Sequence, residues 1–188
     1  MPTFPSFAGE IPPIQTDRLK LRGHRLEDFP DVAALWADPA VTRYIGGKPL
    51  SREEAWARFL RSAGHWAWLG FGFWAVEEKA TGNFVGELGF ADLMRDIETP
   101  FDGTPEIGWV LATRAHGKGY ATEAVRAVLA WGDARFGATR TVCLIHPENL
   151  PSLRVAAKCG YQEFQRTTFK GDPTILLART FPSSGSRR

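Results

Sequence analysis

Hydrophobic and polar positions repeat along the chain with two periods, which predicts both strands and helices. Residues 18–22 alternate apolar and polar side chains, a pattern typical of a half-buried strand. Residues 118–136 place apolar side chains every three to four positions, as an amphipathic helix does. Similar patterns predict strands at 73–77, 84–90, 106–112, 141–146, 161–168 and 174–180, and helices at 27–37, 51–63 and 151–158. We therefore expect an α/β fold with a mixed sheet.

Capping signals mark the ends of two of these helices. Ser51 opens the second helix and Glu54 follows three residues later, which is the spacing of a capping box. Pro151 lies in the first turn of the last helix, and Gly160 lies just beyond its end, where each residue type is favoured. The polar stretch 93–104 follows neither period, so we expect a loop there.

Length and composition predict a single folded domain with short flanking segments. The chain has 188 residues, of which 44% are hydrophobic and 23% charged, and these values are ordinary for one globular domain. Residues 1–15 are rich in proline and small side chains and are expected to form a flexible arm. Residues 182–188 are mostly Ser, Gly and Arg and are expected to be a disordered tail, which leaves residues 16–181 as the domain.

Charge and cysteine usage exclude several classes of partner. The net charge is only +2 and basic residues are interleaved with acidic ones, so no nucleic-acid partner is expected. No apolar run approaches the ~20 residues that a membrane span needs, and no signal peptide is visible, so a cytoplasmic location is expected. Cys143 and Cys159 form no C-x-x-C pair, which predicts buried free thiols and no metal site.

The junction between strand 106–112 and the long helix carries the clearest chemical signal. Gly117 and Gly119 lie where the loop becomes a helix. The first N–H groups of a helix have no partner within the helix, and glycine lets an anion approach them closely. The segment is not a P-loop, because Gly119 follows Lys118, and it fails the dinucleotide pattern, whose last glycine would fall on Thr122. We therefore predict binding of a different phosphorylated cofactor.

The segment from His116 to Ala121 resembles motif A of the GNAT superfamily of N-acetyltransferases, usually written Q/R-x-x-G-x-G/A. A second register, 114–119, also fits, but the first leaves the short strand-to-motif connection usual in the family. Residues 16–22 resemble the first strand of the ribosomal-protein N-terminal (RimJ/RimL-like) branch, and residues 149–152 and 158–161 resemble its motif B. The resemblance spans residues 16–180. It implies the GNAT fold, with a mostly antiparallel sheet of six to seven strands, splayed between strands four and five, and about four helices.

The resemblance also implies acetyl-CoA as co-substrate, without a metal. Its pantetheine arm would bond the backbone of the fourth strand, and its pyrophosphate would lie on the amides from His116 to Ala121, with charge added by Arg114 and Lys118. Asn149 would bond the pantetheine. The implied cofactor-binding positions are Trp109, Val110, Leu111, Arg114, His116, Gly117, Lys118, Gly119, Tyr120, Ala121, Thr122, Asn149 and Ser152.

The resemblance implies two catalytic candidates. Many relatives carry a tyrosine acid at the position of Ala156, and Ser152 matches the branch in which a serine takes that role, although Ser152 could instead cap the helix. Glu106 is the leading general base, and Glu87, His146 or a water molecule are the alternatives.

The expected activity is acetyl transfer to a primary amine by direct attack in a ternary complex. The acceptor is a protein N-terminus or a small molecule. The aromatic segment 64–74, the two predicted helices before it and the loop 94–105 are expected to shape its site. The alternative is a non-catalytic acyl-CoA-binding sensor or interaction module. By family analogy the protein is a monomer or a homodimer.

Overall fold

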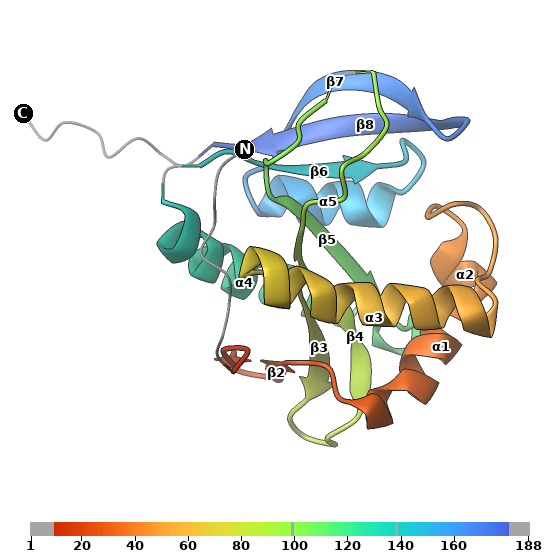
Figure 1. The fold of residues 1–188 in the computed structure, drawn as a ribbon, viewed down its shortest axis with the longest axis vertical. Helices are drawn as coiled ribbons and strands as arrows, with labels where there is room; N and C mark the ends of the chain where they lie inside the picture. The colour runs from red at the N-terminus through yellow and green to blue at the C-terminus, as the bar shows by residue number, and fades with distance from the viewer. Residues whose placement is uncertain (1–9, 99, 138, 181–188) are drawn as a thin grey trace, which may run out of the picture.

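A single sheet of eight strands organises the computed structural model, which describes residues 10–98, 100–137 and 139–180. The strands lie in the order β1-β2-β3-β4-β5-β6-β8-β7, and neighbours are antiparallel except β5 and β6 (Figure 1). Their bounds are Ile14–Gln15, Leu19–Arg22, Phe73–Glu78, Phe84–Ala91, Glu106–Leu111, Thr141–Ile145, Gln162–Phe169 and Asp172–Arg179 for β1 to β8. The predicted mixed, mostly antiparallel sheet is confirmed, with one strand more than expected.

The additional strand β1 lies within the segment 1–15 that was expected to be a flexible arm. It pairs with β2, Ile14 opposite Leu21, and so extends the sheet at its edge. Residues 1–9 and the predicted tail at 182–188 lie outside the described part of the chain.

Five α-helices accompany the sheet in the described ranges, one more than expected. They are α1 Phe29–Ala37, α2 Pro39–Thr42, α3 Arg52–Leu69, α4 Tyr120–Phe136 and α5 Leu150–Lys158. The additional helix, α2, is a single turn with Asp38 as its N-cap. Helix α3 runs six residues beyond its predicted end because its buried stripe, Ala55, Phe59, Ser62 and Trp66, continues past Gly64. Gly70 then ends it in the left-handed conformation that favours glycine.

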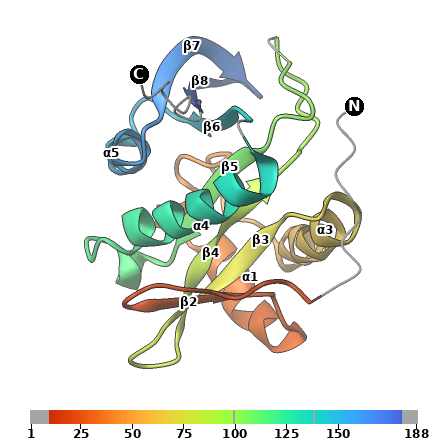
Figure 2. The same cartoon turned by 90° about the vertical axis from the view of Figure 1, so that its left-hand side faces the viewer.

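The helices cover both faces of the sheet and bury two hydrophobic clusters. Helices α4 and α5 lie on one side, and α1 and α3 lie on the other (Figure 2). The larger cluster joins α4, through Val125 and Val128, to sheet residues such as Leu88. The smaller cluster joins α1 and α3 to the opposite face, where Trp36 and Phe59 pack with Val110. No helix in the described ranges is long and apolar enough to cross a membrane.

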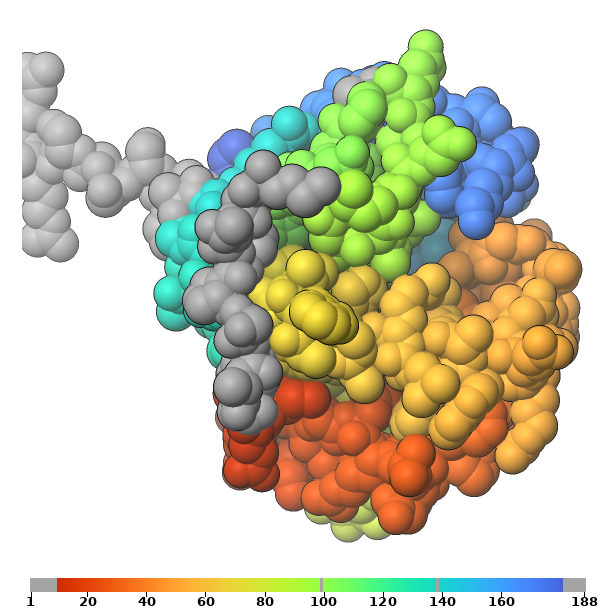
Figure 3. Space-filling view, in the orientation of Figure 1, coloured from red at the N-terminus to blue at the C-terminus, as the bar shows by residue number. Residues whose placement is uncertain are grey.

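The sheet opens between β5 and β6. These strands run parallel but are paired only at Glu106 and Val142, near the start of each. Beyond that point the strands separate, which confirms the predicted splay between the fourth and fifth strands of the core sheet. Three segments from distant parts of the sequence surround the opening in Figure 3, namely the loop after β4, the β7–β8 hairpin and the residues between α2 and α3.

Candidate functional site

One edge of β5 faces the gap in the sheet. The Ala112 N–H donates to the Val85 carbonyl at 3.0 Å on the β4 side, and the Val142 N–H donates to the Pro105 carbonyl at 3.1 Å on the β6 side. Because successive residues direct their backbone groups to opposite edges of a strand, residues 107, 109 and 111 face the gap. They include Trp109 and Leu111, which were expected to bond the pantetheine.

Trp109, Val110 and Leu111 were the β5 residues expected to bind the cofactor, and Val110 and Leu111 differ from that expectation. Val110 directs its backbone groups toward β4, so only its side chain can contribute to the gap. The Leu111 carbonyl already accepts a hydrogen bond from His116 Nε2 at 2.8 Å, so at Leu111 the N–H is the backbone group without this partner. The carbonyl can only accept, so Nε2 of His116 carries a proton.

The loop before α4 presents unpaired backbone N–H groups. Gly117 and Gly119 have φ angles of +74° and +80°, a left-handed conformation that glycine adopts without strain. The first N–H that bonds within α4 is that of Glu123, which donates to the Gly119 carbonyl at 3.2 Å. The N–H groups of residues 120–122 therefore have no partner within the helix. They lie at its positive end, where an anion is favoured.

These groups line a cavity that we call the cofactor cavity. It runs from the β5 edge, past the loop 116–122, to α5. Beyond its two chain neighbours, no residue has a heavy atom within 4 Å of the position that a Cβ of Gly117 would occupy, so the loop stands open on that side. A phosphorylated ligand would find backbone donors at one end of this cavity and the gap in the sheet at the other.

Three loop residues depart from their predicted roles in pyrophosphate binding. Arg114 and Lys118 do not line the cofactor cavity. The Arg114 guanidinium donates to the Phe84 carbonyl, and Lys118 Nζ lies 3.7 Å from a Glu78 carboxylate oxygen. The backbone N–H of His116 donates to the Thr113 carbonyl at 3.1 Å and so is not free for an anion.

Two basic residues outside the predicted cofactor-binding set also line this cavity. Arg154 and Lys158 lie on α5, four residues apart, and both are exposed. Pro151 and Val155 share the same face and also line the cavity. The three-to-four spacing of these positions could have revealed a basic face opposite the glycine loop.

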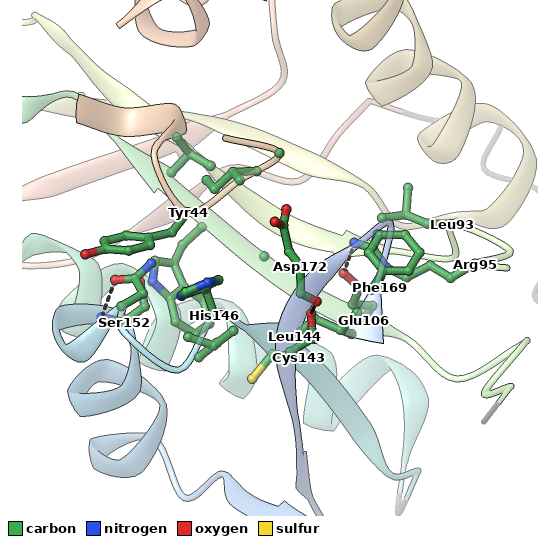
Figure 4. A pocket seen from close by; sticks show the side chains of 18 of the residues that line it. Tyr44, Leu93, Arg95, Glu106, Cys143, Leu144, His146, Ser152, Phe169 and Asp172 are labelled. Carbon is green, nitrogen blue, oxygen red and sulfur yellow. Dashed lines mark hydrogen bonds and ion pairs between the residues drawn. The ribbon is translucent and has the colours of Figure 1, made fainter. Parts of the chain in front are cut away.

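A second cavity adjoins the first, and we call it the acceptor cavity. Both cavities are lined by the same six residues, which are Tyr44, Ile45, Trp109, Val110, Asn149 and Ser152. In Figure 4, Tyr44, Ser152 and His146 lie at one end of the acceptor cavity, and Arg95, Glu106 and Phe169 lie at the other. The shared residues therefore mark the junction where two bound molecules could meet.

Asn149 and Ser152 are joined at the start of α5. Asn149 is the N-cap, and its Oδ1 accepts a hydrogen bond from the Ser152 N–H at 3.2 Å (Figure 4). The capping role considered for Ser152 therefore belongs to Asn149. Ser152 is half-buried and lies at the junction of the cavities.

The structure places Glu106 differently from a general base. Its carboxylate is buried, and Arg95 donates to both of its oxygens at 2.6 Å. The bidentate guanidinium occupies one lone pair on each carboxylate oxygen and fixes the orientation of the side chain. Glu106 lines the acceptor cavity but is committed to Arg95.

Neither alternative side chain is free to act as a base. Glu87 lines neither cavity. Its carboxylate accepts a hydrogen bond from Trp36 Nε1 at 3.0 Å and lies 3.1 Å from His24 Nε2. Burial opposes ionisation of Glu87, but His24, Arg58 and Trp36 together hold its pKa below the usual value. His146 does line the acceptor cavity, but its Nδ1 accepts the backbone N–H of Glu148 at 3.1 Å.

Three further residues of the acceptor cavity were not named individually from the sequence, although the helix that carries Arg58 was expected to shape the acceptor site. Tyr44 stacks on His146 with ring centroids 5.3 Å apart. Asp172 begins β8. Two described carboxylates line this cavity, and Asp172 forms no ion pair with another described residue, whereas Glu106 is paired with Arg95. Arg58 reaches the cavity from α3. Each comes from a different part of the chain, so no local spacing could have grouped them. The predicted loop 94–105 contributes Arg95, and the aromatic segment 64–74 contributes only Phe73.

The model of the acetyltransferase (GNAT) domain matches residues 18–162. The chain belongs to the GNAT family. The uncharacterised protein YkkB of Bacillus subtilis is 34% identical over 166 residues, which cover 86% of this chain and 91% of that protein. A solved structure from Bordetella pertussis, assigned to the GNAT acetyltransferases, is 33% identical, with a TM-score of 0.79 over 89% of this chain and 99% of that one.

A more distant solved structure shares the GNAT fold. RimL, an α-N-acetyltransferase of ribosomal protein L7/L12 in complex with coenzyme A, is 19% identical. The alignment covers 90% of this chain and 98% of RimL, with a TM-score of 0.72. At that identity the likeness shows the fold alone.

GNAT acetyltransferases use acetyl-CoA as co-substrate, and the residues present here fit it. The gap-facing edge of β5 can bond a chain of amides, and the glycine loop can bond a pyrophosphate. Among the described residues, no group of three or more potential ligand side chains could hold a metal ion.

Proposed function

We propose that this acetyltransferase transfers an acetyl group from acetyl-CoA to a primary amine by direct attack within a ternary complex. The observation that carries the proposal is the junction of the two cavities at six shared residues, Ser152 among them. A thioester lying in the gap beside β5 would present its carbonyl at that junction. An amine in the acceptor cavity would then reach it without leaving the protein.

Acetyl transfer needs a donor for the developing oxyanion and a proton for the departing thiolate. The gap-facing edge of β5 supplies backbone N–H groups in the first role, with Trp109 nearest the junction. Ser152 supplies the hydroxyl in the second role, because its N–H is held by Asn149 and its side chain lies where the cavities meet. Tyr44 is the other hydroxyl-bearing residue at the junction.

The acceptor amine must lose a proton to become nucleophilic. Since Arg95 holds Glu106 and the Glu148 N–H occupies His146 Nδ1, we assign the proton to a water molecule in the acceptor cavity. Asp172 lies at the exposed rim of that cavity and stabilises the resulting positive charge. This assignment replaces Glu106 as the leading base.

The acceptor class follows from the branch that the sequence resembles. Residues 16–22 and 149–152 are similar to those of the ribosomal-protein N-terminal acetyltransferases, and RimL shares the fold. We propose that the acceptor is the α-amine of a protein N-terminus or the primary amine of a small molecule.

Release of free thiol tests the proposal. The purified protein is incubated with acetyl-CoA and a panel of peptides, amino acids, polyamines and aminoglycosides, and coenzyme A is measured as it forms. Amine-dependent release is the expected result. Tight binding of coenzyme A without turnover of any amine would instead identify a sensor or interaction module.

A further inference from the structure

Arg58 is the half-buried cation of the acceptor cavity that the proposed chemistry does not use. It projects from α3, lines the cavity and has 28% of its side chain exposed. Its guanidinium carbon lies 3.7 Å from the centre of the Trp36 ring. This stacking leaves the edge of the guanidinium, where the N–H donors lie, free to bond other groups.

Three other arginines in the described ranges, all buried or half-buried, bond carboxylates directly. Arg22 bonds Asp28, Arg95 bonds Glu106 and Arg179 bonds Asp133, each through two nitrogens. Arg58 makes no hydrogen bond to any described side chain or backbone group, and its nearest acid, Glu87, is 3.9 Å away.

Glu87 cannot fully neutralise Arg58. The Glu87 carboxylate already accepts a hydrogen bond from Trp36 Nε1 and lies beside His24 Nε2. Two further cations, Arg61 and Arg95, lie close enough to repel Arg58. Burial, the largest influence, lowers the pKa of Arg58 to about 10, which still leaves it positively charged at pH 7. A desolvated cation with unused donors gains most from a bound anion.

We infer that Arg58 binds a carboxylate of the acceptor, so that the substrate is a primary amine carrying a carboxylate group. This inference rests on the proposed acetyl transfer. Planar carboxylates match the two-pronged donor edge of a guanidinium. The amine end would lie toward Ser152 and Asp172, and Phe73 and Trp109 would contact the apolar part between the two ends.

Matched acids and amides test the inference. Glycine, β-alanine, γ-aminobutyrate and the dipeptide Gly-Gly are compared with their carboxamides as acceptors, by release of free thiol from acetyl-CoA. For at least one length, kcat/KM of the acid should exceed that of the amide by about 10- to 100-fold, the range of a charge-assisted hydrogen bond. Equal rates for acids and amides would overturn the inference and leave acetyl transfer intact.

Three variants separate recognition from folding. Arg58→Met keeps the packing on Trp36 and should reduce the acid-to-amide ratio to about one, because the charge is lost. Arg58→Lys keeps the charge without the paired donors and should give an intermediate ratio. Arg61→Met removes an exposed cation one turn further along α3 and should keep the wild-type ratio. An equal loss of selectivity in Arg61→Met would overturn a specific role for Arg58.

A binding measurement distinguishes failure of this inference from failure of the proposed function. The N-acetylated acids and their amides are titrated into the protein saturated with coenzyme A, and heat is measured. Binding of the acids that depends on Arg58 supports the inference even where no amine is turned over. If Arg58→Met does not fold, the acid-to-amide ratio of the wild-type protein still tests the inference. The inference is overturned if the wild type prefers acids over amides neither in turnover nor in binding.

Discussion

Asn149 holds Ser152 in place at the start of α5, because its side-chain oxygen accepts the Ser152 N–H at 3.2 Å. Asn149 therefore supplies the cap, and Ser152 supplies the hydroxyl at the junction of the cavities. This division lets a serine three residues into a helix face the junction of two cavities. It also separates the effects of changing the two residues.

Ser152→Ala should lower kcat while leaving the affinity for coenzyme A unchanged. Loss of a general acid reduces the rate by about 10²- to 10⁴-fold, and the backbone N–H that Asn149 accepts is retained. Steady-state kinetics and calorimetric titration of coenzyme A measure the two quantities. Ser51→Ala is the control, because Ser51 caps α3 through the Glu54 N–H and its loss should affect stability but not kcat.

Tyr44→Phe should lower kcat by less than about tenfold, since Ser152 carries the proton in our proposal. The substitution keeps the aromatic ring on His146 and removes only the hydroxyl. Kinetics of the two single variants under the same conditions compare the roles directly. A larger loss in Tyr44→Phe than in Ser152→Ala would transfer the acid role to Tyr44.

Glu106→Gln should affect stability more than catalysis. The substitution leaves Arg95 without its charged partner in a mostly buried ion pair. Removing one partner of a buried pair lowers the free energy of unfolding by about 3–5 kcal/mol. Urea denaturation measures that loss. Activity per folded molecule should remain within about tenfold of the wild type, and a loss of about 10²-fold or more would restore Glu106 as the general base.

The double substitution of Arg154 and Lys158 by alanine should weaken coenzyme A binding by roughly three- to thirtyfold, because each exposed charge contributes modestly. Both residues line the cofactor cavity. The effect should shrink as salt increases, since exposed charges are screened. Arg114→Ala serves as the matched control, and a comparable loss of affinity there would contradict the assignment of the phosphate contacts to α5.

Acid should destabilise the protein through Asp28. Burial raises the pKa of this carboxyl, but hydrogen bonds from Arg22 and the Arg25 N–H outweigh burial, so the net shift is downward. A carboxyl with a depressed folded pKa contributes stability above its unfolded pKa, about 3.9, and loses it as the pH falls through the folded value. The urea concentration at the midpoint of unfolding should therefore decrease as the pH is lowered below about 4.

Asp28→Asn provides the comparison for that pH dependence. The variant should be less stable at pH 7, because Arg22 loses one of its two carboxylate partners. Its stability should change less on acidification than that of the wild type. Parallel curves for the two proteins would show that Asp28 is not the group responsible.

Features encoded by neighbouring residues could be predicted. The glycine loop, the capping box at Ser51 and the strand predicted at 18–22 each depend on short spacings, and each was found where it was expected. The end of α3 was misjudged, because the helix was predicted to stop at residue 63, just before Gly64. The buried stripe through Phe59 and Trp66 outweighs the intrinsic cost of one glycine in a helix.

Partners far apart in sequence could not be predicted. Glu106 looked like a base until Arg95 was found against it, and Arg114 looked like a phosphate ligand until its bond to the Phe84 carbonyl was found. Two residues with left-handed φ angles, Lys170 and Gly171, turn the β7–β8 hairpin and bring Asp172 to the acceptor cavity. That position depends on how the hairpin packs.

The sequence by itself determined the mixed sheet and the glycine loop, because periodicity and glycine conformation act over a few residues, and its motifs were enough to show the resemblance to the GNAT family. Only the tertiary structure decided which charges are paired, which side chains lie at the junction of the cavities and that Arg58 keeps unused donors. The physical reason is that pairing depends on distances of a few ångströms between α3, the sheet and the loops. Those distances are set by how the sheet and its helices pack together, and no local pattern records them.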